Sequence, residues 1–344
     1  MKALFYSKPG IENLTCSDYQ LTDLIENEVL IETRFMSVNP IDYYTITGIH
    51  GINGPQMKIS PFPHIPGTEI AGIVKRKGPR VKSEIVEGDR VIVYNRLFDG
   101  TCKYCGINKE MLCINGGMIG LVTNGGYAEY VKIPAQNILK IPDQMSWEVA
   151  SALPVAGLTA LNAIEESGLK AGEYLLIFGG SGNTGLFCSQ IGKIMGAKTI
   201  SISSKSWVAD FGADFVFENS MTLKKEIAHV TSDSMVDVVI NPLGELTWNQ
   251  GMNVIGKMGT IVTYGVLTGG NLITDGRLLY NNQITIKGTT GGSLSGLAKL
   301  INMVKAENIR TKIWKRFSLE DSKRAVESLF DKNREGRIII ENQG

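Results

Sequence analysis

Three glycines, Gly180, Gly182 and Gly185, lie at the spacing of a nucleotide-binding turn. The apolar run 174–178 ends just before them, and a helical pattern begins just after them. Glycines at this spacing allow a tight turn, close approach of the backbone to a pyrophosphate, and close packing of helix on strand. Free N–H groups at the helix N-terminus favour the anion. The predicted contacts in this turn are Gly180, Gly182, Asn183, Thr184 and Gly185.

The segments after this turn alternate between strand and helix patterns. Residues 198–203, 236–240 and 260–264 are predicted as buried strands, and helical patterns lie between them. This alternation predicts an α/β fold with a doubly wound parallel sheet, a Rossmann domain, over residues 146–282. Residues 282–287 alternate apolar and polar side chains and are a candidate edge strand.

The end of the second predicted strand bears on the choice of cofactor. Many NAD-binding domains have an acidic residue here that binds the ribose hydroxyls. This chain has Ser203, Ser204 and Lys205 instead. Two hydroxyls and an ammonium group can bind a 2′-phosphate through charge-assisted hydrogen bonds, which favours NADPH. The alternative is a polar turn with a solvated lysine.

Length and composition fit an enzyme of two domains. The chain has 344 residues, of which 43% are hydrophobic, and a net charge of +1. This length exceeds what one hydrophobic core usually supports. The charge gives no reason to expect nucleic acid or an anionic membrane as a partner. The first residues do not resemble a signal peptide, so we expect a cytoplasmic protein.

The region before residue 146 has a different pattern, with short alternating strands separated by Gly, Pro and Asn. The clearest strands are 28–35, 70–74, 89–94 and 127–131. They predict an all-β partial barrel. Helices near 294–305 and 319–330 and a final strand at 336–341 are expected to return to it. The first domain would then comprise 1–145 and 283–344, with the substrate in a cleft beside the Rossmann domain.

This order of domains, with the motifs along them, resembles the medium-chain dehydrogenase/reductase superfamily over essentially the whole chain. That superfamily includes zinc alcohol dehydrogenases and zeta-crystallin-like quinone oxidoreductases, and its catalytic domain is a GroES-like barrel. The resemblance implies a homodimer or homotetramer acting on a small molecule. The motifs that carry it are 37–42, 66–72, 86–91, 125–130, 153–160 and 196–198. The further cofactor contacts that it implies are Thr159, Gly265, Val266, Thr289 and Thr290.

The chain departs from the alcohol dehydrogenase pattern at the catalytic zinc. The positions of its three ligands are occupied by Asn39, Thr68 and Ala156. None of these offers a thiolate or an imidazole, from which catalytic zinc sites are built. The proton-relay hydroxyl of that branch falls at Ile41, and Glu69 alone is more typical of a structural residue. We therefore predict no catalytic zinc.

Asn39 and Tyr44 resemble the quinone oxidoreductase branch, where such residues line the nicotinamide site. Hydride transfer to an enone or quinone requires proximity, orientation and a proton source, without an obligatory Lewis acid. We assign Asn39 and Tyr44 as the catalytic pair, with the Tyr44 hydroxyl as hydrogen-bond donor. The alternative for Tyr44 is a packed aromatic residue.

A second metal site is predicted outside the catalytic region. Asp99, Cys102, Cys105 and Cys113 have the spacing of the structural-zinc lobe of alcohol dehydrogenases, with Asp99 at the first cysteine position. Three thiolates and one carboxylate can complete a tetrahedral zinc shell. We expect one structural zinc per chain. The alternative is a lobe that has lost its metal and retains Cys102 and Cys105 as a free or oxidisable pair.

These features predict an NADPH-dependent oxidoreductase that reduces a quinone, an enone or another activated double bond. The alternatives are an NADP(H)-dependent alcohol or aldehyde dehydrogenase, and a non-catalytic NADP(H)-binding redox sensor. The full set of cofactor contacts favours an enzyme, because a sensor need not keep a shaped cleft over the nicotinamide. His50 and His64 are expected at the surface.

Overall fold

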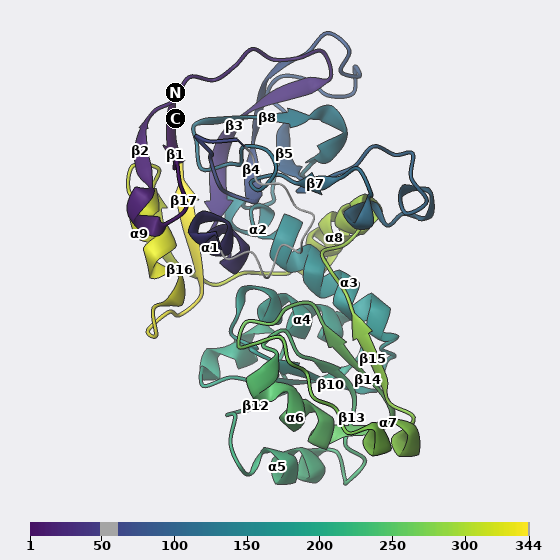
Figure 1. Ribbon diagram of the computed structural model, residues 1–344. Helices are drawn as coiled ribbons and strands as arrows, with labels where there is room; N and C mark the ends of the chain where they lie inside the picture. The colour runs from purple at the N-terminus through teal and green to yellow at the C-terminus, as the bar shows by residue number, and fades with distance from the viewer. Residues whose placement is uncertain (49–60, 343–344) are drawn as a thin grey trace. The chain divides into compact units, whose positions relative to one another are not determined.

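A computed structural model describes residues 1–48 and 61–342. The chain forms two compact units, Met1–Val155 with Ser293–Gly344, and Ala156–Gly292 (Figure 1). The predicted boundaries were 145/146 and 282/283. The first lies later because the segment before residue 156 bonds to the first unit: the Ser151 and Ser37 hydroxyls are 3.1 Å apart. The second lies later because strand Thr285–Gly288 extends the sheet of the second unit.

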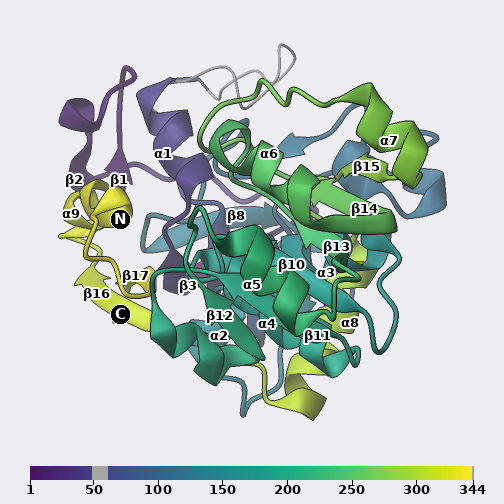
Figure 2. The same cartoon turned by 90° about the horizontal axis from the view of Figure 1, so that it is seen from below.

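The second unit contains a six-stranded parallel sheet with the order β12-β11-β10-β13-β14-β15, which Figure 2 shows from β12 to β15. This is the predicted Rossmann-like sheet. Its strands are β10 Tyr174–Phe178, β11 Lys198–Ile202, β12 Phe215–Phe217, β13 Val236–Ile240, β14 Ile255–Thr263 and β15 Thr285–Gly288.

Helices cover both faces of this sheet, because neighbouring side chains of a buried parallel strand point in opposite directions. On β10, Leu175 faces Gly192 of α4, whereas Leu176 and Phe178 share a core with side chains of α5 and α6. The helices are α3 Leu158–Ser167, α4 Asn183–Ile194, α5 Leu223–Val230, α6 Glu245–Val254 and α7 Gly276–Asn282.

The first unit is the GroES-like domain and is built mainly of antiparallel strands. Its large sheet has the order β16-β17-β3-β4-β5-β9, and β8 also pairs with β3. The C-terminal strand β17 pairs antiparallel with β3, so the end of the chain completes this sheet. The strands of this sheet are β3 Glu28–Ser37, β4 Glu69–Lys77, β5 Arg90–Val93, β8 Tyr130–Pro134, β9 Ile138–Lys140, β16 Ile313–Ser318 and β17 Arg337–Glu341.

In the described part of this unit, two short strand pairs and four α-helices accompany this sheet. The pairs join β1 to β2 and β6 to β7. These elements are β1 Lys2–Phe5, β2 Thr15–Asp18, β6 Arg96–Leu97, β7 Gly117–Met118, α1 Pro40–Thr47, α2 Trp147–Ala150, α8 Leu294–Glu307 and α9 Ser322–Glu327. Among the described residues, no helix is long and apolar enough to cross a bilayer.

Two predicted elements differ from the structure. The candidate edge strand 282–287 begins with the end of helix α7, and Gln283 then takes a left-handed conformation with φ 52° before β15 starts at Thr285. The helix expected over 319–330 is shorter: α9 ends at Glu327 and a 3-10 turn, Ser328–Phe330, follows. Both differences lie at element ends, where local turn geometry overrides apolar periodicity.

Candidate functional site

The glycine turn connects β10 to α4 in the second unit. Gly182 is the N-cap of α4, and its N–H donates to the carbonyl of Gly179 at 2.9 Å. A Cβ atom on Gly185 would lie 2.3 Å from that same carbonyl oxygen, closer than any side chain tolerates. Only glycine therefore fits at Gly185, where the helix packs directly on the turn. The N-terminus of α4 lies at this turn, and a helix N-terminus is the kind of end at which a pyrophosphate can bind.

The residues predicted to select the cofactor follow the adjacent strand. β10 and β11 pair in parallel, with Phe178 opposite Ile202, so their carboxyl ends lie at the same edge of the sheet. Ser203 and Ser204 leave this edge, and the Lys205 N–H donates to the Ser203 hydroxyl at 3.0 Å. The structure thus brings the turn and this polar segment together.

The remaining predicted cofactor residues lie just after two strands and on one helix of the same unit. Gly265 and Val266 follow β14, and Thr289 and Thr290 follow β15, its parallel neighbour. The Thr289 N–H donates to the Thr263 carbonyl at 2.9 Å. A Cβ on Gly292 would lie 2.7 Å from the Leu158 side chain, which brings this segment against α3, the helix of Thr159.

Sequence reasoning missed two residues at this edge. Asn241 follows β13, and its side-chain oxygen accepts from the Leu243 and Gly244 N–H groups at 3.2 and 3.3 Å. Tyr264 follows β14, and its buried hydroxyl meets no hydrogen-bond partner among the described residues. An Asn-Pro-Leu-Gly sequence directly after a buried strand was the available signal for the first. No local sequence pattern indicates Tyr264.

A buried polar cluster surrounds Asn39 in the first unit. Asn39 is 3% exposed, and its side-chain amide donates to Glu69 Oε2 at 2.8 Å. Glu69 is fully buried and forms an ion pair of 2.5 Å with Arg337, which is 1% exposed. The three residues belong to adjacent segments, because β17 and β4 flank β3 on either side. Sequence analysis missed Arg337 and treated Glu69 only as a structural residue.

Asp42 fixes the backbone around this cluster. Its carboxylate accepts from the Asn39 and Thr68 N–H groups, both at 2.9 Å, and from the Tyr127 hydroxyl at 3.0 Å. Burial raises the pKa of Asp42 to about 7, whereas these donated hydrogen bonds favour the charged form. The Thr68 hydroxyl is buried and meets no partner within the described ranges.

Tyr44 lies on α1 and is half-buried beside aromatic neighbours. Its ring centroid is 6.1 Å from that of Tyr43 and 6.4 Å from that of Phe330. Burial raises the pKa of the Tyr44 hydroxyl, which therefore stays protonated at neutral pH. These contacts fit the packing role considered for Tyr44, and a protonated hydroxyl is also what a hydrogen-bond donor requires.

His64 is not at the surface, contrary to prediction. The residue is fully buried, and its ring Nε2 lies 2.9 Å from the Gly120 carbonyl. Its backbone exchanges two hydrogen bonds with Tyr6, and this pairing holds the segment in the core despite its flanking prolines. Burial lowers the pKa of His64, so the ring is neutral. His50 lies outside the described residues.

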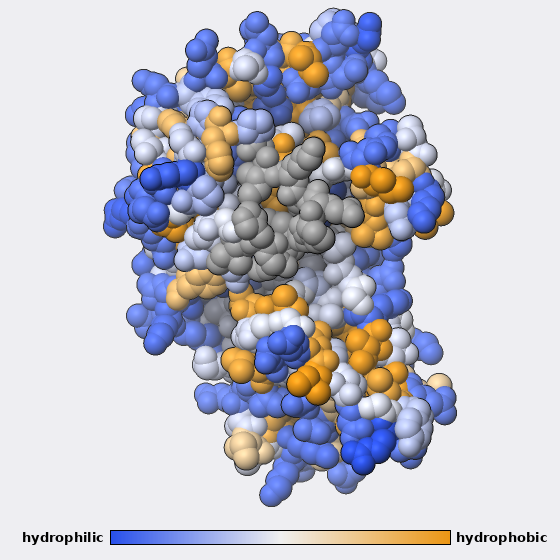
Figure 3. Space-filling model, in the orientation of Figure 1, coloured by the Kyte–Doolittle hydropathy of each residue, from blue (hydrophilic) through white to orange (hydrophobic). Residues whose placement is uncertain are grey.

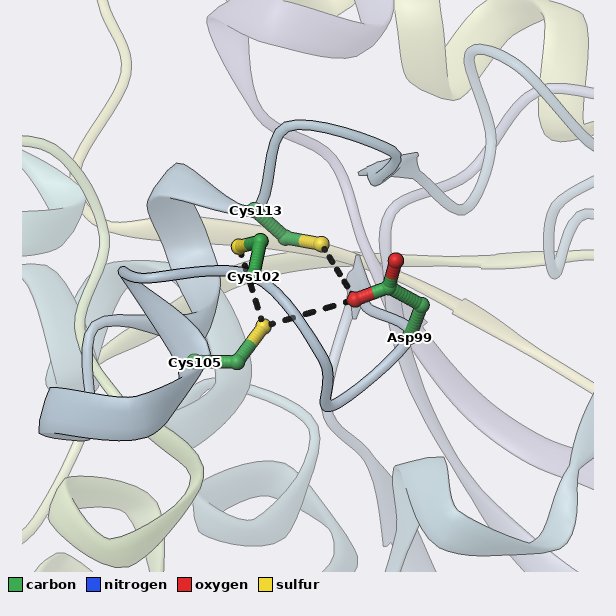
Figure 4. Close-up of side chains that lie close together, drawn as sticks. All are labelled: Asp99, Cys102, Cys105 and Cys113. Carbon is green, nitrogen blue, oxygen red and sulfur yellow. Dashed lines mark hydrogen bonds between the residues drawn. The ribbon is translucent and has the colours of Figure 1, made fainter.

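The four predicted zinc ligands converge in the first unit (Figure 4). Cys102 and Cys105 have sulfurs 3.5 Å apart, and Asp99 Oδ1 lies 3.4 Å from Cys113 Sγ and 3.8 Å from Cys105 Sγ. A tetrahedral zinc needs S–S edges of about 3.8 Å and S–O edges of about 3.5 Å, as its bond lengths dictate. The donor set and its spacing therefore fit zinc.

The carboxylate of this lobe is held by its neighbours. The Asn115 side chain donates to Asp99 Oδ2 at 2.6 Å, and the Thr101 N–H donates to Asp99 Oδ1 at 2.9 Å. These bonds lower the pKa of Asp99, which keeps its carboxylate ionised and available as a ligand. Across the described ranges, this is the one group of three or more His, Cys, Asp or Glu side chains close enough to share a metal.

Two family models match the chain. The model of the alcohol dehydrogenase GroES-like domain matches residues 25–143, and that of the zinc-binding dehydrogenase matches residues 184–306. The first covers the part of the first unit that contains Asn39 and the lobe. The second begins inside the glycine turn.

Relatives with these domains match the whole chain or most of it. The NAD-dependent alcohol dehydrogenase of Sulfolobus acidocaldarius is 28% identical over 99% of both chains. The quinone oxidoreductase of Sus scrofa is 26% identical over 79% of this chain and 72% of its own. The solved structure of a cobalt- and zinc-bound thermostable alcohol dehydrogenase from Pyrobaculum aerophilum is 33% identical, with a TM-score of 0.89 over 99% of both chains.

The lobe geometry predicts one zinc per purified chain. Replacing Cys102 and Cys105 together by Ser should remove that zinc, because two of four ligands are lost, and should lower the melting temperature by several degrees. Metal analysis and thermal unfolding measure both effects. Cys16→Ser, a half-buried cysteine outside the lobe, is the control and should keep its zinc. Two zincs per wild-type chain, or a zinc retained by the double variant, contradicts this assignment.

Proposed function

Since the chain belongs to the medium-chain dehydrogenase/reductase superfamily, we propose that it is an NADPH-dependent reductase of quinones, enones or other activated double bonds, working without a catalytic zinc. The observation that carries this proposal is the donor set of the first unit. Asn39, Thr68 and Ala156 stand at the positions of the zinc ligands, and the Asn39 amide already donates to Glu69. An amide, a hydroxyl and a methyl group do not replace thiolate and imidazole ligands.

The chemistry follows from the lack of Lewis-acid ligands. NADPH would supply a hydride, and the acceptor must then accommodate the negative charge that the hydride brings. A conjugated acceptor spreads this charge over several atoms, whereas an isolated carbonyl concentrates it on one oxygen. The half-buried Tyr44 hydroxyl is our candidate for donating a hydrogen bond to that oxygen, with Asn39 orienting the reactants.

The choice of NADPH rests on the segment after β11. The Sulfolobus acidocaldarius relative is named as NAD-dependent, so relatedness by itself favours NADH. In this chain Ser203, Ser204 and Lys205 offer two hydroxyls and one ammonium group and no carboxylate. A carboxylate there would repel a 2′-phosphate, whereas an ammonium group attracts it.

An NADP(H)-dependent alcohol or aldehyde dehydrogenase is the second candidate. It is favoured by the names of the relatives from Sulfolobus acidocaldarius and Pyrobaculum aerophilum. Such an enzyme would have to polarise an isolated carbonyl with neutral hydrogen-bond donors alone, and this gives less stabilisation of the developing charge than a metal ion.

We also infer that a second copy of the chain covers the outer edge of β15. Among the described strands β15 pairs with β14 alone, which leaves backbone groups at its other edge to pair. Ile286 on β15 is 39% exposed, and Ile273 and Tyr280, which precede it, are 79% and 70% exposed. Figure 3 shows apolar side chains on this unit. Pairing about a two-fold axis gives a homodimer, and two such dimers give a homotetramer.

Light scattering of the purified protein measures its oligomeric state. Single chains at micromolar concentration would contradict this inference.

Lys205→Ala should weaken NADPH binding by roughly 1–3 kcal/mol while leaving NADH binding nearly unchanged, because only NADPH has the 2′-phosphate. Fluorescence titration with each cofactor measures this difference. Lys198→Ala is the matched control, since Lys198 lies at the amino end of the same strand, away from the predicted phosphate site at its carboxyl end. Equal losses for both cofactors would remove Lys205 from the phosphate site.

Conjugated enones and quinones should exceed saturated ketones in kcat/KM by orders of magnitude, because only they delocalise the added charge. Steady-state NADPH oxidation with matched pairs of acceptors, such as an enone and its saturated ketone, measures the ratio. Efficient zinc-dependent oxidation of simple alcohols would support the dehydrogenase instead. Tight NADPH binding without turnover of any acceptor would support a redox sensor.

Tyr44→Phe in the same assay should lower kcat by about tenfold or more if the hydroxyl donates to the acceptor. Tyr43→Phe is the control, because Tyr43 lies on the same helix and packs against the core of the first unit. An unchanged kcat for Tyr44→Phe assigns Tyr44 to packing alone.

A further inference from the structure

We propose that Glu69 is a positioning residue of the reaction, which acts by fixing the direction of the Asn39 amide. This inference rests on the proposed function, in which Asn39 orients the reactants. Its physical basis is the hydrogen bond of 2.8 Å from the Asn39 amide to Glu69 Oε2, between two side chains that are 3% and 0% exposed.

The direction of the amide follows from the chemistry of its partner. The amide of Asn39 has one donating and one accepting end, and the two exchange places when the group rotates by half a turn. A carboxylate only accepts, so the NH₂ end must face Glu69. The carbonyl end of Asn39 therefore points away from Glu69. Without the carboxylate, nothing in this bond would select one orientation over the other.

Glu69 is held in place by two further partners. Its Oε2 accepts from Arg337 at 2.5 Å, and its Oε1 accepts from the Val155 N–H at 3.0 Å. Without this ion pair, a fully buried carboxylate would be costly to accommodate. A charged acceptor also makes a shorter and stronger hydrogen bond to the amide than a neutral one would.

Backbone and side chain of Asn39 are thus fixed by different carboxylates. The Asp42 carboxylate accepts from the Asn39 N–H at 2.9 Å and sets where the residue stands, and the capping box of α1 also engages the Asn39 side chain with the Asp42 backbone. Glu69 accepts from the NH₂ end of the amide and favours the same orientation. Arg337, at the start of the neighbouring strand β17, supplies the cation that pairs with Glu69. In the position of a metal ligand, the chain therefore has an amide whose orientation depends on a buried ion pair.

The test is a double-mutant cycle with Glu69→Gln and Asn39→Ala. Glu69→Gln keeps the size of the side chain but offers the amide a donor as well as an acceptor, so this contact no longer selects the orientation of Asn39. We expect kcat to fall roughly ten- to a hundredfold, because misplaced reactants react more slowly. The dissociation constant for NADPH should stay within about threefold. Asn39→Ala should then cost at least tenfold less in the Glu69→Gln background than in the wild type.

Glu32→Gln is the matched control. Glu32 is also buried, at 5% exposure, and forms ion pairs of 2.9 and 3.0 Å with Arg34 and Lys75 in the same sheet. It should change stability without changing kcat or the effect of Asn39→Ala. If Glu69→Gln fails to fold because Arg337 loses its partner, Glu69→Gln with Arg337→Gln removes both charges and takes its place in the cycle.

Two outcomes separate this proposal from the proposed function. Additive effects of the Glu69 and Asn39 substitutions in an active enzyme overturn the positioning role and leave the reductase intact. A wild type that turns over no acceptor overturns the reductase, and the NMR spectrum of the asparagine side-chain amides then decides the orientation. A Glu69→Gln change that leaves the Asn39 NH₂ signals unmoved shows that Glu69 does not bind this amide.

Discussion

Burying a carboxylate is costly unless hydrogen bonds replace the water that it loses, and Asp42 meets that requirement from three separate segments of the chain. The Asn39 N–H begins α1, the Thr68 N–H precedes β4, and the Tyr127 hydroxyl precedes β8. The carboxylate therefore fixes the relative positions of residues 39 and 68, and with them the place of Glu69, the next residue along the chain.

The first unit contains two polar centres built on different physical grounds. At the lobe, three cysteine side chains and a carboxylate lie near the surface, with their ligand atoms within 4.8 Å of one another, so this donor set suits a metal ion. Around Asn39, a buried guanidinium already balances Glu69 and occupies one of its oxygens. A carboxylate that is already paired with a cation and hydrogen-bonded is a poor ligand for a metal ion. The lobe residues are thus suited to binding a cation, whereas the residues around Asn39 are not.

Local patterns in the sequence were sufficient for the glycine turn, the parallel sheet and the close approach of the four lobe residues, because each depends on spacing within a short segment. They were insufficient for His64, where prolines indicated a surface loop but pairing with Tyr6 buries the ring. They also could not reveal Arg337 as the partner of Glu69, since those residues are 268 positions apart. A pairing of this range depends on strand order, which periodicity alone does not specify. The roles of Asn39, Tyr44 and the cofactor contacts remain predictions.

The late position of β17 has a consequence for how the protein is made. A ribosome adding about 5–20 residues per second completes Glu69 roughly 15 to 50 s before it reaches Arg337. During that interval the second unit, 156–292, is synthesised in full, while the first still lacks the strand beside β3. A chain released early retains a carboxylate that has no cation to accompany it into the core. This site can therefore close only after β17 has been synthesised, and products truncated before β17 lack the strand that pairs with β3 beside β4.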